Sequence, residues 1–136
     1  MIRFKMNRIT IPQFAILKEE IGIGNIKVGT KVQVKYSLDI KSIGINMVIT
    51  CNNNTEKVMM LELFCEFGIH PEDWDSLIKN NILTLSKEDI SYFVAQTIGT
   101  ARGVFHCKTE GTSFNHIIIP PMNAMEMVKE DLVVKL

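Results

Sequence analysis

The sequence predicts an α+β fold in which an antiparallel β-meander sheet is followed by a long helix and a short C-terminal helix. Three consecutive segments alternate apolar and polar residues with the two-residue period of strands that bury one face. At Ser86 the apolar spacing changes to three and four residues, which is the period of a helix. Because no internal repeat or long linker divides the chain, we expect residues 1–136 to form a single domain, and a chain of this length can bury its own core.

The chain is expected to begin with a strand. Ile2, Phe4 and Met6 are separated by polar residues, and this alternation is typical of a strand with one buried face. Pro12 has no backbone N–H group and is therefore expected to interrupt the pairing. Residues 22–29 are rich in glycine and are expected to form a turn.

The three segments of the expected meander cover residues 32–40, 45–51 and 58–67. Residues 42–44 are expected to supply the first reversal of the chain. Residues 52–54 are asparagines, which tolerate left-handed backbone angles, and are expected to supply the second reversal. We therefore expect each of these strands to run antiparallel to the one before it.

The third of these strands is unusual because both of its faces carry apolar side chains. Its first face is apolar throughout, whereas Met60 and Phe64 lie among acidic residues on the second face. The following helix is expected to cover only one face of the sheet. The second face is therefore expected to be covered by another subunit or by a bound extended peptide.

The long helix is expected to begin after Ser86. Residues 86–89 resemble a capping box, in which a hydroxyl and a carboxylate bind the free amides of the first turn. Apolar residues then recur at helical spacing and form one stripe that reaches Arg102 or a few residues beyond it. The stripe consists of Ile90, Phe93, Val94, Thr97, Ile98 and Ala101.

The segments on either side of this helix are expected to be mostly irregular. Residues 70–74 leave the sheet, and residues 76–85 are expected to form a connector with one short helical turn. Residues 108–115 are polar and are expected to form a loop. Asn123 begins a second cap signature, so we expect a short helix that continues through residues 127–130.

The composition is that of an ordinary globular protein. The 15 basic and 15 acidic side chains balance to a formal net charge of zero and are spread along the whole length. Nucleic-acid binders usually carry a basic excess or stripe, so no nucleic-acid partner is expected. No segment reaches the roughly 20 apolar residues of a transmembrane helix, and the first residues lack the apolar core of a signal peptide. We therefore expect a cytoplasmic protein without a membrane span.

The cysteines and histidines raise the alternatives of a metal site or a thiol enzyme. Cys65 and His70 are five residues apart, and Cys107 follows His106 directly. Structural zinc sites usually show two pairs of ligands at short spacing, and Cys65 belongs to the apolar face of a predicted strand, where free cysteine acts as a small core residue. We therefore expect no metal, no cofactor and no catalytic residue. The odd number of cysteines also favours a reducing compartment over a disulfide framework.

Four short strings stand in order along the chain. Residues 9–14 read Ile-Thr-Ile-Pro-Gln-Phe, residues 92–98 read Tyr-Phe-Val-Ala-Gln-Thr-Ile, residues 102–103 read Arg-Gly, and residues 117–123 read Ile-Ile-Ile-Pro-Pro-Met-Asn. Together with the alternating segments, these strings resemble the SecB export-chaperone family, whose members are antiparallel-sheet and helix domains that assemble as tetramers. The resemblance spans most of the chain and implies the SecB-like form of the fold described above.

The chain also departs from the pattern of that family. Gln96 and Thr97 stand where the helix usually carries charged residues, and the loop at residues 104–116 is longer than the family's compact turn. The sequence ends at Leu136 without the basic, metal-binding tail by which typical members engage the export motor, so coupling to that motor is not expected. A general export chaperone and a relative that holds one dedicated client, such as an unstable antitoxin-type protein, both fit the sequence.

The resemblance implies a homo-oligomer, a dimer or a tetramer, that binds unfolded or partly folded polypeptides without nucleotide hydrolysis. In such proteins the clients lie along apolar grooves beside the sheet. The client-binding residues expected from this resemblance and from the excess of apolar side chains are Phe14, Met60, Phe64, Ile117, Ile119 and Met122. Two alternatives stay open: a structural or regulatory oligomer of the same fold with no client, and a small thiol enzyme that uses Cys107 or Cys65 with a histidine.

Overall fold

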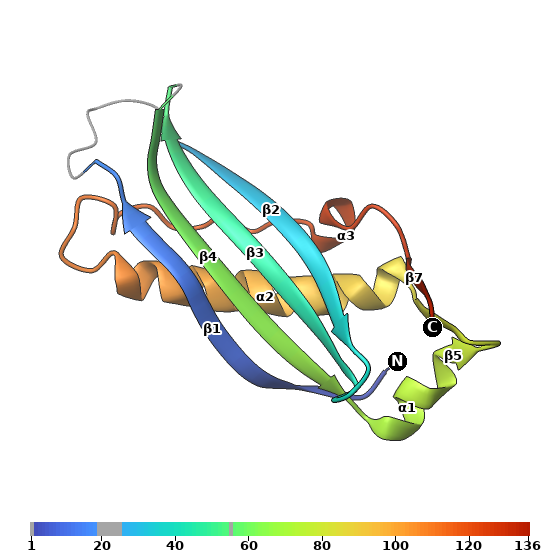
Figure 1. Ribbon diagram of the computed structural model, residues 1–136. Coiled ribbons are helices and arrows are strands. Elements are labelled where there is room, and N and C mark those ends of the chain that lie inside the picture. The colour runs from blue at the N-terminus through green and yellow to red at the C-terminus, as the bar shows by residue number, and fades with distance from the viewer. Residues whose placement is uncertain (1, 19–25, 55) are drawn as a thin grey trace.

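A four-stranded antiparallel sheet, a long helix across one of its faces and a small three-stranded sheet at one end make up the fold (Figure 1). The structure is a computed structural model that describes residues 2–18, 26–54 and 56–136. Its elements are β1 (Phe4–Ile16), β2 (Ile26–Ser37), β3 (Ser42–Asn53), β4 (Glu56–Ile69), α1 (Pro71–Ser76), β5 (Ile78–Lys79), β6 (Ile82–Leu85), α2 (Lys87–Lys108), α3 (Ala124–Met127) and β7 (Leu132–Lys135). The predicted fold class, an antiparallel sheet followed by a long and a short helix, is confirmed.

The large sheet has the strand order β1-β4-β3-β2, and every neighbouring pair is antiparallel. Strands β2, β3 and β4 follow one another as the alternating pattern predicted. Of the expected reversal at residues 52–54, Asn52 and Asn53 belong to β3. Asn54 follows them with a φ of 58°, which is the left-handed angle that asparagine tolerates. Because β1 pairs with the far side of β4, the two edges of the sheet are β1 and β2.

Strand β1 continues beyond Pro12, where the sequence predicted an interruption of pairing. Thr10 lies opposite Phe64. Gln13 forms the next pair with Glu62, so β1 contains one extra residue between these two pairs. Such a bulge accommodates a residue without an N–H group, and edge strands tolerate it because one of their sides has no strand partner. The pairing is therefore disturbed at the proline, but the strand then resumes.

The reversal between β2 and β3 occupies residues 38–41, and the prediction that it lies at residues 42–44 is wrong. Leu38 and Ile40 are 43% and 55% exposed. Their spacing continues the alternation of the strand, but neither side chain is buried. The alternation therefore predicted a strand that extends too far. Lys41 closes the reversal with a φ of 50°.

Strand β2 also begins earlier than the sequence predicted. Residues 26–29, the second half of the expected glycine-rich turn, pair with β3. Gly29 lies close to the neighbouring strand, since a Cβ atom there would be 3.1 Å from Oγ1 of Thr50. The first half of the expected turn, residues 22–25, lies outside the described residues.

The core lies between the large sheet and α2. All six residues of the predicted helix stripe are buried. The ring of Phe93 in α2 lies 5.0 Å from that of Phe67 in β4 and 4.7 Å from that of Phe4 in β1, measured between ring centres. Ser86 accepts a hydrogen bond from the N–H group of Asp89 (3.1 Å), so the predicted cap begins the helix. The buried strand residues that face α2 are Ile43, Ile45, Met47, Ile49, Cys51, Met59, Leu61, Leu63, Cys65, Phe67 and Ile69.

The segment between the large sheet and α2 holds a helix and a hairpin, so the predicted connector with one helical turn over residues 76–85 is wrong. His70 caps α1 by accepting a hydrogen bond from the N–H group of Glu72 at Nδ1 (3.3 Å). Strands β5 and β6 then pair across Asn80 and Asn81, whose φ angles are 53° and 61°. Two consecutive positive φ angles are typical of a tight hairpin turn, and asparagine favours them.

The chain after α2 returns along that helix. The helix ends at Lys108, so the loop expected at residues 104–116 is wrong over residues 104–108, and the polar loop begins after Lys108. Arg102 holds the returning segment by donating hydrogen bonds from Nε to the carbonyl oxygen of Ile119 (2.7 Å) and from Nη2 to that of Pro120 (3.3 Å). The apolar run that precedes the two prolines is thereby fixed against the helix.

The last residues form a short helix and a strand. Asn123 caps α3 as predicted, because its Oδ1 accepts a hydrogen bond from the N–H group of Met125 (3.0 Å). The predicted helix includes Met127, but its continuation through residues 128–130 is wrong, since α3 ends at Met127. Strand β7, which the sequence did not predict, pairs antiparallel with β6 and completes the small sheet.

Replacing Phe93 by Ala is expected to lower the free energy of unfolding by about 3 to 5 kcal/mol, because it removes a buried ring and leaves a cavity. The adjacent Tyr92 is 40% exposed, and Tyr92→Ala is expected to cost less than about 1 kcal/mol. Urea unfolding followed by circular dichroism measures both. Equal losses for the two variants would contradict the helix orientation described here.

Candidate functional site

A groove runs along the outer edge of β2, between that strand and residues 126–132. It consists of two hollows with volumes of about 300 and about 490 Å³. Val32, Met127 and Lys129 border both hollows, which are therefore neighbouring parts of one depression. The other lining residues are Thr30, Lys31, Val34, Ile90, Glu126, Val128, Glu130, Asp131 and Leu132.

The groove follows from the position of β2 at the edge of the sheet. Within the described residues, β3 is the one strand that pairs with β2. The chain passes beside β2 on its way from α3 to β7, but β7 pairs with β6 instead. Figure 1 shows α3 beyond the β2 edge of the large sheet. The space between the strand and the passing segment is therefore left open.

Apolar side chains form the floor of the groove. Val32 and Val34 lie on the face of β2 that points toward α2, and both are half-buried. Ile90 of α2 is 1% exposed and closes the bottom of the groove. Met127 and Leu132 are half-buried on the opposite wall. Because the side chains of β2 and of the opposite wall are only partly covered, an apolar segment placed in the groove would bury them further, which is favourable.

The face of the sheet that points away from α2 is polar around one aromatic ring. Phe64 lies over Gly44, where a Cβ atom would come within 2.5 Å of the ring. The guanidinium carbon of Arg8 and the Nζ atom of Lys35 lie 5.8 and 5.9 Å from the centre of that ring. Phe64 is therefore half-buried within its own chain and is flanked by two cations, an arrangement that stabilises both the ring and the charges.

The expected client-binding residues of the strands lie on two different faces of the sheet. Met60 and Phe64 point to the open face, where they lie opposite Thr50 and Asn46 of β3. Phe14 points to the other face, because it lies opposite the buried Leu61. These three side chains are half-buried, and no single partner surface joins them.

The other expected client-binding residues lie in the segment that returns along α2. Ile117 and Met122 are half-buried and pack against the core. Ile119 is 1% exposed and belongs to the core itself. The structure therefore does not bring the six residues together, and a role for them in binding clients stays a prediction.

The residues that line the groove were not selected by the sequence reasoning. Val32 and Val34 belong to the most regular alternating segment, and that alternation correctly predicts which face of the strand is apolar. It does not reveal that the strand lies at an edge, because strand order depends on pairing between distant residues. Met127 was expected inside a helix, and the pattern gave no sign that it faces β2.

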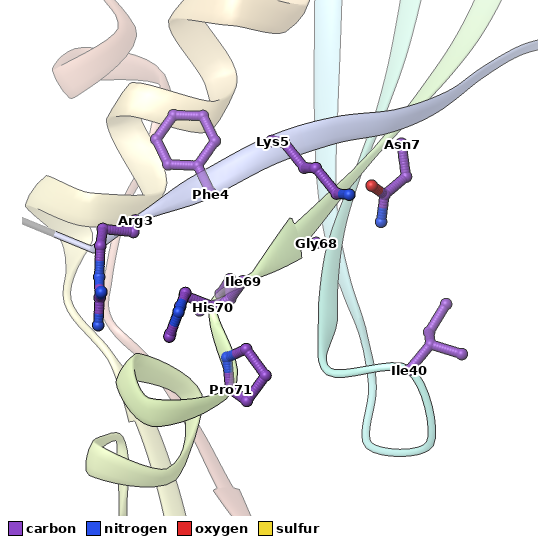
Figure 2. A pocket seen from close by; sticks show the side chains of 9 residues that line it. All are labelled: Arg3, Phe4, Lys5, Asn7, Ile40, Gly68, Ile69, His70 and Pro71. Carbon is purple, nitrogen blue, oxygen red and sulfur yellow. The ribbon is translucent and has the colours of Figure 1, made fainter.

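A third hollow, of about 450 Å³, lies away from the groove, between the start of β1, the end of β4 and the turn that carries Ile40 (Figure 2). Two of its polar side chains already have partners. His70 accepts a hydrogen bond from the backbone of α1, and Arg3 donates hydrogen bonds to Asp73. Asn7 lies over Gly68, where a Cβ atom would collide with it. Lys5 also lines the hollow. Few polar groups therefore converge on a ligand here, and the groove beside β2 is the stronger candidate site.

Arg3, at the border of the third hollow, fastens the chain just before β1 to α1. It donates hydrogen bonds to Oδ2 of Asp73 from its backbone N–H group (2.8 Å) and from Nε (3.0 Å), and to Oδ1 from Nη2 (3.1 Å). Nη2 also lies 3.4 Å from Oε2 of Glu72. The hydrogen bonds from Arg3 lower the pKa of Asp73 from 3.8 to about 2.

The cysteines differ in their surroundings. Cys51 and Cys65 are buried in the core, and Cys107 is exposed near the end of α2. Burial raises the pKa of the Cys51 thiol from 9.0 to about 11 and also raises the pKa of Cys65. Both buried thiols are therefore protonated near neutral pH, unlike nucleophilic cysteines. Over residues 2–18, 26–54 and 56–136, no three His, Cys, Asp or Glu side chains are grouped so that they could hold a metal ion.

None of the helices in the described part of the chain combines the length and the apolar character that crossing a bilayer requires.

The fold is similar to that of a known chaperone. No protein-family model and no curated protein sequence matches the chain. Among solved structures, it is similar to a SecB-like chaperone of Mycobacterium tuberculosis in complex with a ChAD peptide from an antitoxin, with 10% identity, a TM-score of 0.58, and coverage of 88% of this chain and 91% of that chain. A protein of unknown function from Streptococcus agalactiae matches with 10% identity and a TM-score of 0.39 over 81% of this chain and 90% of that chain. The first likeness shows a SecB-like fold.

The clamp between Arg3 and Asp73 is expected to make stability depend on pH in acid. Because the pKa of Asp73 is lowered on folding, the clamp stabilises the fold fully above about pH 4, and this contribution is lost as the pH falls through about 2. The difference in free energy of unfolding between the wild type and Asp73→Asn should therefore shrink between these pH values. Asp39→Asn, in the exposed turn, serves as the control, and a difference that stays constant with pH would contradict the clamp.

Proposed function

We propose that this protein binds extended segments of unfolded or partly folded polypeptides in the groove beside β2 and thereby keeps them from aggregating. The observation that carries the proposal is an apolar groove that lies directly beside an edge of the sheet, where no further strand of the described residues pairs with β2. An extended chain can bury its apolar side chains on the floor of the groove and form backbone hydrogen bonds with the edge strand. Binding of this kind needs neither catalysis nor a cofactor.

The likeness to the Mycobacterium tuberculosis chaperone supports the proposal, because that protein was solved in complex with a peptide. The size of the groove also supports the proposal, because its two hollows, of about 300 and about 490 Å³, have room for a few apolar side chains. Fully burying one apolar side chain contributes about 1.5 to 3 kcal/mol, so a few such contacts give a binding that is useful and still reversible. Reversible binding is what a protein that holds and releases clients requires.

We further propose that the protein is not an enzyme. A thiol enzyme needs an accessible cysteine with a lowered pKa. Of the two candidate nucleophiles, Cys65 is buried and its pKa is raised, whereas Cys107 is exposed. Replacing Cys107 by Ser is expected to leave the protection of unfolded proteins unchanged. The alternative of a structural or regulatory oligomer with no client differs from our proposal in one measurable respect, which is the absence of any protection of unfolded proteins.

The groove is tested by making one apolar side chain of its floor and one of its opposite wall polar without changing its shape. The double variant Val32→Thr/Met127→Gln is expected to weaken binding of an unfolded client by about tenfold or more, because each replacement removes an apolar contact of about 1 kcal/mol. The measurement is suppression of light scattering by a chemically denatured test protein that is diluted into buffer with increasing amounts of each variant.

The matched control is Val133→Thr/Met125→Gln, which makes the same chemical changes outside the groove. Val133 and Met125 are 61% and 42% exposed, and Met125 belongs to the same helix as Met127. The control should protect the client as the wild type does. If both double variants protect equally well, and both keep the wild-type thermal unfolding, the groove does not bind clients.

The homo-oligomer, a dimer or a tetramer, is part of the proposal. Ile9 and Ile11 on the edge strand β1 are 47% and 37% exposed, and Leu17 just beyond it is 58% exposed. Apolar side chains on an unpaired edge favour pairing with another chain. Light scattering coupled to size exclusion should give two or four times the chain mass of 15.5 kDa. A mass of 15.5 kDa at micromolar concentration would contradict this part of the proposal.

A further inference from the structure

We propose that the β2 edge selects client segments in which acidic and apolar residues alternate, and that such a segment binds as an added strand of the large sheet. This inference rests on the proposed function of the groove and names the chemistry of its partner. It follows from the charges that β2 and the opposite wall of the groove present.

The face of β2 that points toward α2 is apolar, whereas its open face carries lysines. Val28, Val32 and Val34 lie opposite buried residues of β3, and directly opposed residues of antiparallel strands share a face. These valines therefore point toward α2. Because side chains alternate along a strand, the intervening residues point to the open face. Three of these are the exposed lysines Lys27, Lys31 and Lys35.

The lysine row is not neutralised within the part of the chain that the structure describes. None of the three lysines forms an ion pair with a described residue, although Lys35 lies beside the Phe64 ring. Their partners in β3 are the uncharged residues Asn52, Val48 and Gly44. Glu62, farther across the sheet on β4, already accepts a hydrogen bond from Asn46 (3.0 Å). An acidic partner therefore finds unpaired positive charge along this edge.

The opposite wall of the groove carries mainly negative charge. It carries Glu126, Glu130 and Asp131 against one cation, Lys129. Asp131 also accepts a hydrogen bond from the N–H group of Lys87 (2.7 Å), which keeps its carboxylate in place. Acidic side chains that point into the groove would meet this wall and be repelled, whereas apolar side chains would reach the floor.

An added strand can place acidic side chains beside the lysine row and apolar side chains over the floor of the groove at the same time. Its side chains would point alternately to the open face, beside the lysine row, and into the groove, over the valines of β2 and Met127. Lys31 and Val32 point to opposite faces of the strand and yet border the same hollow, so the hollow reaches around the edge where such a strand would pair. Alternation of acidic and apolar residues is therefore the pattern that fits.

The same charges disfavour a second copy of this chain at the β2 edge. Antiparallel pairing of two β2 strands would place one lysine row beside the other on the same face. Like charges on adjacent strands are destabilising, and lysines on an edge strand are a known means of preventing pairing between copies. The edge is therefore kept unpaired by the charge that attracts an acidic partner.

The test uses the full chain and two fluorescent peptides of 12 residues, the length of β2. One alternates Val with Glu and the other alternates Val with Lys. The Val/Glu peptide is expected to bind at least about tenfold more tightly at low salt, and added salt should reduce the difference. Binding is followed by fluorescence anisotropy, and protection of a denatured test protein is measured on the same samples.

The decisive variant is Lys27→Glu/Lys31→Glu, which should weaken binding of the Val/Glu peptide by about tenfold or more. The control Lys79→Glu/Lys135→Glu changes the net charge equally at exposed positions of the small sheet and should change the affinity by less than about twofold. If the first variant does not fold, Lys27→Gln/Lys31→Gln removes the same positive charges and is expected to weaken binding in the same direction.

Equal binding of the two peptides, or equal effects of the two charge-reversed variants, would overturn the inference. Either result would leave the proposed function intact if the denatured test protein is still protected. A wild-type protein that pairs through β2 and thereby excludes the peptide would also overturn it. If neither peptide binds and the test protein is not protected, the proposed function fails together with the inference.

Discussion

The packing of α2 across the large sheet is the interaction on which the other features depend. A helix is about 10 Å wide and strands lie about 4.8 Å apart, so one helix covers about two strands. α2 lies nearest to β3 and β4, and the side chains of these strands that face it are buried. The outer strands β1 and β2 are covered only in part, which explains why Phe14 and Val32 are half-buried on the same face. The helix that completes the core thus leaves apolar surface at both edges.

The two edges then differ in what they present to a partner. β1 carries exposed isoleucines, which suit pairing with a second copy, whereas β2 carries the lysine row, which opposes it. The hydrogen bonds from Arg102 direct the returning chain along α2, and α3 and residues 128–131 then pass beside β2 without pairing with it. We propose that these features assign self-assembly to one edge and client binding to the other.

Much of the fold could be predicted from the sequence because it depends on local patterns. The alternation in β2, β3 and β4, the cap at Ser86 and the stripe along α2 are all local, and the structure confirms them. Errors arose where a local pattern had two physical meanings. Leu38 continues the alternation of a strand but lies in an exposed turn, and Asn80-Asn81 supply a hairpin turn that was interpreted as a connector.

The candidate site could not be predicted in the same way, because it depends on which strands lie at the edges and where the returning chain passes. Apolar character and the family resemblance selected Ile119, which is in the core, and grouped Phe14 with Phe64, although the two side chains lie on opposite faces of the sheet. The sequence could show that apolar surface exceeded what one helix covers. It could not show that the last segment leaves a groove beside β2, since that segment is held by contacts between residues that are far apart in the sequence.

Hydrogen–deuterium exchange with and without an unfolded client tests the central claim most directly, because it reports which backbone amides a bound polypeptide protects. The proposed mode of binding predicts slower exchange in β2 and in residues 126–132 when the client is present, with no change in β1. Protection confined to β1 or to the open face around Phe64, or unchanged exchange in β2 under conditions in which the client is held, would contradict it.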